Sequence, residues 1–217
     1  MHWRLLDDVD GAEVARALAL ARTRTFQRDE VIFHEGDPAD TVHLIEDGRV
    51  AVRSATRHGQ RATLAVLGPG EAFGELALLG ARARRSATVV AIEPVVTKSI
   101  YDGDFKRLRD RHPEVSEVLI ALLSEHVRRL SSQLLDALFL PAESRVRKRL
   151  LELTARYETV DGETVIPLRQ EDLADLAGTS RATVNRVLRE EVARGTIRTT
   201  RGSTTVVDSS RLADLIW

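Results

Sequence analysis

The chain has 217 residues, 43% of them hydrophobic, no cysteine, and a formal net charge of -1. This size and apolar content suit two small domains with buried cores, while the missing cysteines exclude disulfides, thiolate-held iron-sulfur clusters and a cysteine nucleophile. The charged first thirty residues and the absence of any apolar run near about 20 residues predict a cytoplasmic protein with no signal peptide and no membrane span.

Short strands are predicted through most of the first half of the chain. Residues 11–22 suit a short amphipathic helix, and from Thr25 to Tyr101 short runs rich in Val, Ile and Thr alternate with turn clusters. The runs are VIFH, TVHLI, RVAVRSA, ATLAVL, SATVVAI and VVTKSI. Strands at this regular spacing are typical of an antiparallel sandwich or barrel, and about seven strands would close one.

A long helix is predicted from Pro113 to about Phe139, since proline is favoured at the first helical position. Its apolar residues alternate spacings of three and four, at Ile120, Leu123, Val127, Leu130, Leu134 and Ala137. Such a seam is typical of a two-stranded coiled coil, which predicts a homodimer. The alternative is a helix packed on its own barrel.

Pro141 ends this helix, so a hinge and a domain border are predicted at residues 139–141. Beyond the hinge we expect a basic amphipathic helix from Glu143 to about Tyr157, a turn at Asp161-Gly162 and a short strand near residues 165–166. Two short helices and a wing hairpin, IRTTRGSTTVV, follow. The predicted parts are a strand-rich domain at 1–112, a dimerisation helix at 113–139 and a domain of short helices with a wing at 140–217, an α+β chain overall.

The segment RQEDLADLAGTSRATVNRVLREEVARG has the pattern of a helix-turn-helix. Gly178 permits a tight turn and Ser180 is placed to cap the second helix. Its inward residues are Val184, Val187 and Leu188. The opposite face presents Arg181, Ala182, Asn185, Arg186 and Arg189, which are side chains suited to base edges. An ordinary helical hairpin with a solvated arginine face is the alternative.

Positive charge is concentrated around this segment. Between Arg181 and Arg201 six arginines stand against Glu190 and Glu191, a local balance of +4 in a nearly neutral molecule. A localised basic patch of this kind is the electrostatic pattern of a nucleic-acid interface.

The sequence resembles the cyclic-AMP receptor protein (Crp/Fnr) family of regulators over nearly its whole length. The resemblance is carried by FGELALL and RRSA in the strand region, by the long helix, and by RQEDLADLAGTSRATVNRVL, in that order. It implies an N-terminal antiparallel β-barrel, the jelly roll that binds cyclic nucleotides, followed by the dimerisation helix and a winged helix-turn-helix.

The resemblance also implies a ligand site in the barrel. In the family's phosphate-binding cassette the glutamate, here Glu75, accepts from the ribose 2'-hydroxyl, and the arginine, here Arg85, neutralises the cyclic phosphate. Gly74 and Ser86 supply backbone and hydroxyl donors, and Leu76 belongs to the same segment. A phosphate bound in this way needs a cation and several N–H donors. The alternative is a structural ion pair between Glu75 and Arg85 across a turn.

The base-binding positions depart from the family. Counting back without gaps from Arg145, the family's adenine-contacting arginine, threonine and serine fall on His126, Leu130 and Ser131, and only the serine is retained. Leucine cannot bond the adenine amino group, and a buried polar edge left unpaired costs about 1–3 kcal/mol. His126 could donate instead, and a frame slipped by three would place Arg129 there. The implied effector is a cyclic nucleotide, with cyclic AMP favoured.

The reading helix also departs from the family, which commonly has Arg, Glu and Arg at the positions of Arg181, Ala182 and Arg186. Alanine cannot accept from a cytosine amino group, so the palindromic site is expected to differ at the base pair read by Ala182. Arg181 and Arg186 would read bases, while Arg189, Arg201 and the wing would contact phosphates. The full set expected at DNA is Arg169, Ser180, Arg181, Ala182, Thr183, Asn185, Arg186, Arg189 and Arg201.

The expected function is that of a homodimeric transcription regulator, with double-stranded DNA, a cyclic nucleotide and RNA polymerase as partners and no membrane. One rival is a regulator of the same fold that needs no ligand or senses another one. A second is a cyclic-nucleotide-binding module whose C-terminal helices dock protein. No catalytic constellation is visible, and the six histidines are scattered, so neither an enzyme nor a metal site nor a cofactor is expected.

Overall fold

The computed structural model describes residues 3–6, 10–76 and 84–216. Its contacts divide the chain into two compact units, one made of Met1–Ser54 and Leu64–Arg129, the other of Ala55–Thr63 and Leu130–Trp217. The long helix α4 (Pro113–Phe139) belongs to both units. The division into parts at 112 and 139 stays a prediction, although α4 begins at the predicted proline and ends at the predicted residue.

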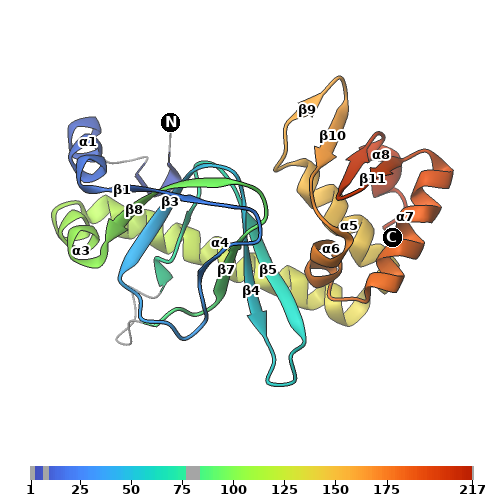
Figure 1. Cartoon of the computed structure of the whole chain (residues 1–217), viewed down its shortest axis with the longest axis horizontal. Helices are drawn as coiled ribbons and strands as arrows, with labels where there is room; N and C mark the ends of the chain where they lie inside the picture. The colour runs from blue at the N-terminus through green and yellow to red at the C-terminus, as the bar shows by residue number, and fades with distance from the viewer. Residues whose placement is uncertain (1–2, 7–9, 77–83, 217) are drawn as a thin grey trace. The chain divides into compact units, whose positions relative to one another are not determined.

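The strand region folds into two antiparallel four-stranded sheets. The first has the order β1 (Arg22–Phe26), β8 (Val95–Tyr101), β3 (Thr41–Asp47) and β6 (Ala72–Phe73). The second has the order β2 (Val31–Phe33), β7 (Thr88–Ala91), β4 (Val50–Ala55) and β5 (Arg61–Leu67). Figure 1 shows β4 and β5 as a hairpin. The antiparallel arrangement is confirmed, and closure into a barrel stays a prediction.

Two of these eight strands differ from the sequence prediction. The helix expected over 11–22 ends at Leu20, and β1 begins at Arg22. The segment RTRTF lacks an apolar run because four of its five residues are exposed, and only Phe26 enters the core. The strand β6 is a two-residue strand within a segment that its glycines marked as a turn.

Apolar residues from both sheets share one core, which contains Phe26, Ile45, Val50, Ala65, Leu67, Phe73, Val89, Ala91 and Val95. A second core lies between the first sheet and the helices α1 (Gly11–Leu20), α3 (Asp102–Arg111) and the start of α4. Phe105 and Val115 are fully buried there. Both faces of β3 are therefore covered, and its residues 42–45 are all buried.

The C-terminal unit contains three main helices and a four-stranded sheet, visible in the orange and red part of Figure 1. The helices are α5 (Ala142–Thr154), α6 (Gln170–Ala177) and α7 (Arg181–Arg194), followed later by the short α8 (Ser209–Ala213). The sheet has the order β11 (Ile197–Thr200), β12 (Ser203–Val206), β10 (Glu163–Ile166) and β9 (Thr159–Val160). The predicted wing is the β11–β12 hairpin, while α5 ends three residues earlier than expected, at Thr154.

Candidate ligand pocket and nucleic-acid interface

Gly74 and Arg85 meet where β6 ends. Gly74 has a φ of +89°, and a Cβ at this position would lie 2.6 Å from Nη1 of Arg85. The same Nη1 donates to the carbonyl oxygens of Gly74, at 3.2 Å, and Thr41, at 2.7 Å, and Nη2 donates to the hydroxyl of Thr41, at 2.8 Å. Glycine is therefore required here both for the backbone conformation and for the approach of the guanidinium.

Glu75 carries a buried carboxyl group that lacks a full set of partners. Its side chain is part of a residue only 5% exposed, and its Oε2 has no hydrogen-bond partner among the described residues. Burial raises the pKa of Glu75 to about 7, against the lowering effect of its own backbone N–H and of Arg85. A buried acceptor without a donor costs free energy, so a ligand hydroxyl that donated to this oxygen would remove that cost.

Arg85 is also buried, at 4% exposure, and its Nε has no hydrogen-bond partner in the described part of the chain. The guanidinium lies over the ring of Phe33, with 4.0 Å from Cζ to the ring centroid, and Nη2 lies 3.5 Å from Oδ1 of Asp40. It borders a cavity of about 210 Å³ whose lining also includes His43 and Tyr101. Arg85 is thus a cation beside a small hollow.

The two charges of the cassette do not pair with each other. Glu75 and Arg85 are both described, and the ion pair that Arg85 makes is with Asp40, not with Glu75. This geometry disfavours the alternative in which they form a structural ion pair. The other cassette positions, Leu76 and Ser86, are exposed; residues 77–83 of the motif lie outside the described residues.

His43 is a polar residue of this region that the sequence interpretation did not select. It stacks on Phe73, with 4.9 Å between ring centroids, and its Nδ1 lies 3.1 Å from the hydroxyl of Thr97. Burial, followed by the charge of Arg85, lowers the pKa of His43 to about 4, so the ring is neutral at pH 7. A histidine within the apolar strand TVHLI was the signal that could have identified it.

The proposed base-binding residues all lie on α4. His126 is half-buried, and burial lowers its pKa. Leu130 and Ser131 are exposed in a single chain. Their assignment to the base stays a prediction.

The helix-turn-helix has the predicted local chemistry. Gly178 ends α6 in the left-handed conformation, with φ at +59°, and the Ser180 hydroxyl accepts from the backbone N–H of Thr183 at 3.1 Å. Val184, Val187 and Leu188 are buried, as the pattern predicts. Of the expected DNA-contacting side chains, Thr183 and Asn185 are half-buried, and the others are exposed: Arg169, Ser180, Arg181, Ala182, Arg186, Arg189 and Arg201.

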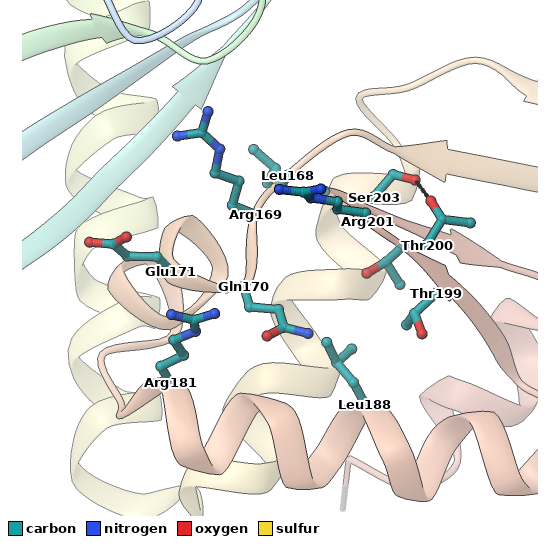
Figure 2. A pocket seen from close by; sticks show the side chains of 12 residues that line it. Leu168, Arg169, Gln170, Glu171, Arg181, Leu188, Thr199, Thr200, Arg201 and Ser203 are labelled. Carbon is teal, nitrogen blue, oxygen red and sulfur yellow. Dashed lines mark hydrogen bonds between the residues drawn. The ribbon is translucent and has the colours of Figure 1, made fainter.

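Three of the predicted arginines surround one cavity, shown in Figure 2. Arg169 lies at the start of α6, Arg181 at the start of α7, and Arg201 at the tip of the wing. The cavity has a volume of about 360 Å³, and its wing side also carries the hydroxyls of Thr200 and Ser203, which are 2.6 Å apart. Cationic and hydroxyl donors converging at a helix start are suited to phosphate oxygens.

A buried ion pair between Arg147 of α5 and Glu191 of α7 holds the two helices together. Glu191 is fully buried, and its carboxylate accepts from Nε of Arg147, at 2.8 Å, and from the hydroxyl of Thr196, at 2.7 Å. The pKa of Glu191 is lowered by these hydrogen bonds and charges, which outweigh the opposing effect of burial. The sequence analysis counted Glu191 only in the local charge balance, because its partner Arg147 lies 44 residues away.

These features define a class of protein: an antiparallel β-sheet domain with a buried, partly unsatisfied acid and arginine, followed in the chain by a winged helix-turn-helix. Comparisons with known proteins agree. Residues 23–112 match the cyclic nucleotide-binding domain, and residues 144–215 match the Crp-like helix-turn-helix domain.

Two curated relatives match along nearly the whole chain. The chain is 32% identical over 212 residues to the CRP-like cAMP-activated global transcriptional regulator of Mycobacterium tuberculosis, covering 96% of this chain and 94% of the relative. It is 34% identical over 205 residues to the cyclic AMP receptor protein of Thermus thermophilus, covering 94% and 93%. Among solved structures, FixK2 from Bradyrhizobium japonicum has the same fold, with a TM-score of 0.80 at 23% identity over 90% of this chain and 96% of that one.

The chain belongs to the Crp/Fnr family of transcription regulators. It is a DNA-binding regulator with a cyclic-nucleotide-binding domain, and it is not an enzyme. Among the described helices, none combines the length and the apolar character that crossing a membrane requires.

Proposed function

We propose that the protein is a homodimeric, cytoplasmic regulator whose DNA binding is controlled by a cyclic nucleotide, with cyclic AMP favoured. The observation that carries the proposal is the pair of unsatisfied buried atoms, Oε2 of Glu75, which follows Gly74 in the chain, and Nε of Arg85, whose Nη1 contacts Gly74. A ribose hydroxyl and a cyclic phosphate oxygen would supply the missing donor and acceptor. The names of the two curated relatives, cAMP-activated regulator and cyclic AMP receptor protein, support the same class of effector.

The exposed seam of α4 supports the dimer. Ile120, Val127 and Leu134 are each about 60% exposed in the single chain, and they follow the coiled-coil spacing. A second copy of α4 would cover them, since an exposed apolar stripe of this length is unfavourable in water. The dimer would place two recognition helices in successive major grooves about one helical turn apart, which predicts a palindromic site.

Within each half-site, Arg181 and Arg186 would read bases. Arg169, Arg189 and Arg201 would contact phosphates, and the cavity of Figure 2 would face the sugar-phosphate backbone of the DNA. Because Ala182 has no acceptor, the base pair that it meets would be read through a thymine methyl or not at all. RNA polymerase would then be recruited or blocked at the bound site.

Calorimetry tests the ligand site directly. The wild-type protein, titrated with cyclic AMP and with cyclic GMP, should bind at least one nucleotide, and Arg85→Leu should lose that binding while remaining folded. Arg84→Leu is the matched control, because Arg84 is exposed and donates to the carbonyl of Gly36 instead. Normal binding by Arg85→Leu would refute the pocket assignment.

Salt dependence of DNA binding separates the proposal from its second rival, a module that docks protein. Affinity for a duplex should fall steeply with salt, since each phosphate contact releases condensed counterions. The first rival, a regulator with an unused or different pocket, predicts tight DNA binding that neither nucleotide changes.

A further inference from the structure

Arg186, the arginine of α7 proposed to read a base, is part of a row of alternating charges that joins α5 to α7. Arg186 donates through Nη2 to Glu143, in the first turn of α5, and its Nη1 lies 3.6 Å from Oε1 of Glu190. The second oxygen of Glu190 accepts from Arg147 at 3.1 Å. Both partners of Arg186 are therefore carboxylates of the same compact unit.

The row has a regular geometry. Glu143 and Arg147 are four residues apart on α5, and Arg186 and Glu190 are four residues apart on α7, so each pair lies on one face of its helix. The hydrogen bond from Arg186 is the largest cause that lowers the pKa of Glu143. Glu143 is thus ionised at neutral pH and opposes the arginine directly.

Arginine reads guanine with two N–H donors, one for O6 and one for N7. In this structure Nη2 of Arg186 is occupied by Glu143, and Nη1 is next to Glu190. The bond to Glu143 uses one of the two N–H groups of Nη2 and orients the guanidinium toward the first turn of α5. Turning both terminal nitrogens toward the edge of a guanine would exchange the bond to Glu143 for one to the base.

We infer that Glu143 is a specificity-determining residue that competes with guanine for Arg186. This inference rests on the proposed function, since it needs α7 in a major groove. At a site with guanine at the base pair read by Arg186, each complex must break the Glu143 contact. At a site without that guanine, Arg186 stays on Glu143 and the competition has no effect. Glu143 therefore reduces the gain in DNA affinity that this guanine provides.

The test is Glu143→Gln, which keeps the side chain's size and removes its charge. Two duplexes are compared by fluorescence anisotropy: the palindrome obtained by selection, and the same palindrome with the guanine read by Arg186 replaced in both half-sites. That guanine is the one whose replacement no longer matters to Arg186→Ala. Glu143→Gln should bind the first duplex about 2-fold to 5-fold more tightly, the range of an exposed ion pair, and should change the second by no more than Glu158→Gln does.

Two controls separate this effect from general electrostatics. Glu158→Gln removes one carboxylate from an exposed position just beyond α5, and it should tighten binding to both duplexes by the same small factor or not at all. In an Arg186→Ala background, Glu143→Gln should have no duplex-dependent effect. Thermal unfolding of each variant checks that α5 remains folded.

Equal tightening on both duplexes, the same gain in Glu158→Gln, or persistence of the effect without Arg186 would overturn the inference. So would unchanged or weaker binding of the first duplex by a folded Glu143→Gln. These outcomes leave the proposed function intact, because the wild-type protein would still bind its palindrome. Failure of the wild-type protein to prefer any duplex would instead refute the proposed function.

Discussion

Gly74 and Arg85 are in such close contact that only glycine fits: a Cβ on residue 74 would lie 2.6 Å from Nη1 of Arg85 and 3.0 Å from the carbonyl oxygen of Thr41. The contact ties the turn after β6 to the cation at the pocket. We therefore expect Gly74 to position Arg85 for a ligand phosphate.

Gly74→Ala should therefore lower nucleotide affinity by at least about 10-fold, and should destabilise the fold by about 1 kcal/mol or more because of the positive φ. Calorimetry measures the first effect and urea unfolding the second. Gly59→Ala is the matched control, since Gly59 has a φ of +81° with nothing within 4 Å of its Cβ position. Gly59→Ala should be destabilised by the positive φ but should keep nucleotide binding. Loss of binding in both variants would contradict the role of Gly74 in positioning Arg85.

The carboxyl of Glu75 should make stability fall as pH rises. Its pKa is about 7 in the folded chain and near the ordinary 4.5 when unfolded, so between these pH values the folded state holds more protons. Glu75→Gln removes the ionisable group, and with it the fall in the free energy of unfolding as pH rises. We expect the variant to be more stable than wild type above pH 7, by on the order of 1–3 kcal/mol, with the difference vanishing below pH 4.5. Urea unfolding at several pH values measures it, and parallel pH profiles for both proteins would be the contrary result.

The buried pair behind the recognition helix should be important for stability. Glu191→Gln removes the buried ionised partner of Arg147 and leaves it only the partly exposed Glu190, which should lower the free energy of unfolding by about 3 kcal/mol. Glu152→Gln is the control, because its side chain is 47% exposed in its pair with Arg149 and should cost under about 1 kcal/mol. Denaturant unfolding compares the two, and equal losses would show that burial of Glu191 is not the cause.

The seam of α4 should control the oligomeric state. Leu134, 60% exposed in the single chain, is one of the residues of the predicted dimer contact. Leu134→Asp should convert the dimer to a monomer, since like charges would meet across the seam. Sedimentation measures the mass, with the exposed Arg128→Asp as a charge control off the seam. If the wild-type protein sediments as a monomer, the alternative is favoured, in which α4 packs only on the strand domain of its own chain.

Local chemistry explains which parts of the fold could be predicted. The helix α4 and the helix-turn-helix were predictable because Pro113, Gly178 and Ser180 determine their ends through contacts within a few residues. The strand β1 was not, because its Arg and Thr residues become a strand only by pairing with β8, more than 70 residues later.

In the candidate sites, too, features set by nearby residues could be predicted and contacts between distant segments could not. The cassette residues were identified by resemblance, but the burial of Glu75 and the contacts of Arg85 with Thr41 and Phe33 depend on segments distant in sequence. The contact between Glu143 and Arg186 spans 43 residues and has no local signal. The sequence therefore predicts which residues contact DNA, and the structure was needed to show the contact between Glu143 and Arg186.

The central claim is that a nucleotide held by Arg85 controls DNA binding. Fluorescence anisotropy of a selected palindromic duplex, with cyclic AMP, with cyclic GMP and with neither, tests it most directly in wild type and Arg85→Leu. We predict that one nucleotide alone tightens binding by about 10-fold or more, a coupling free energy typical of allosteric proteins, and that Arg85→Leu shows no such change. Equal binding under all three conditions by the wild-type protein would contradict the claim.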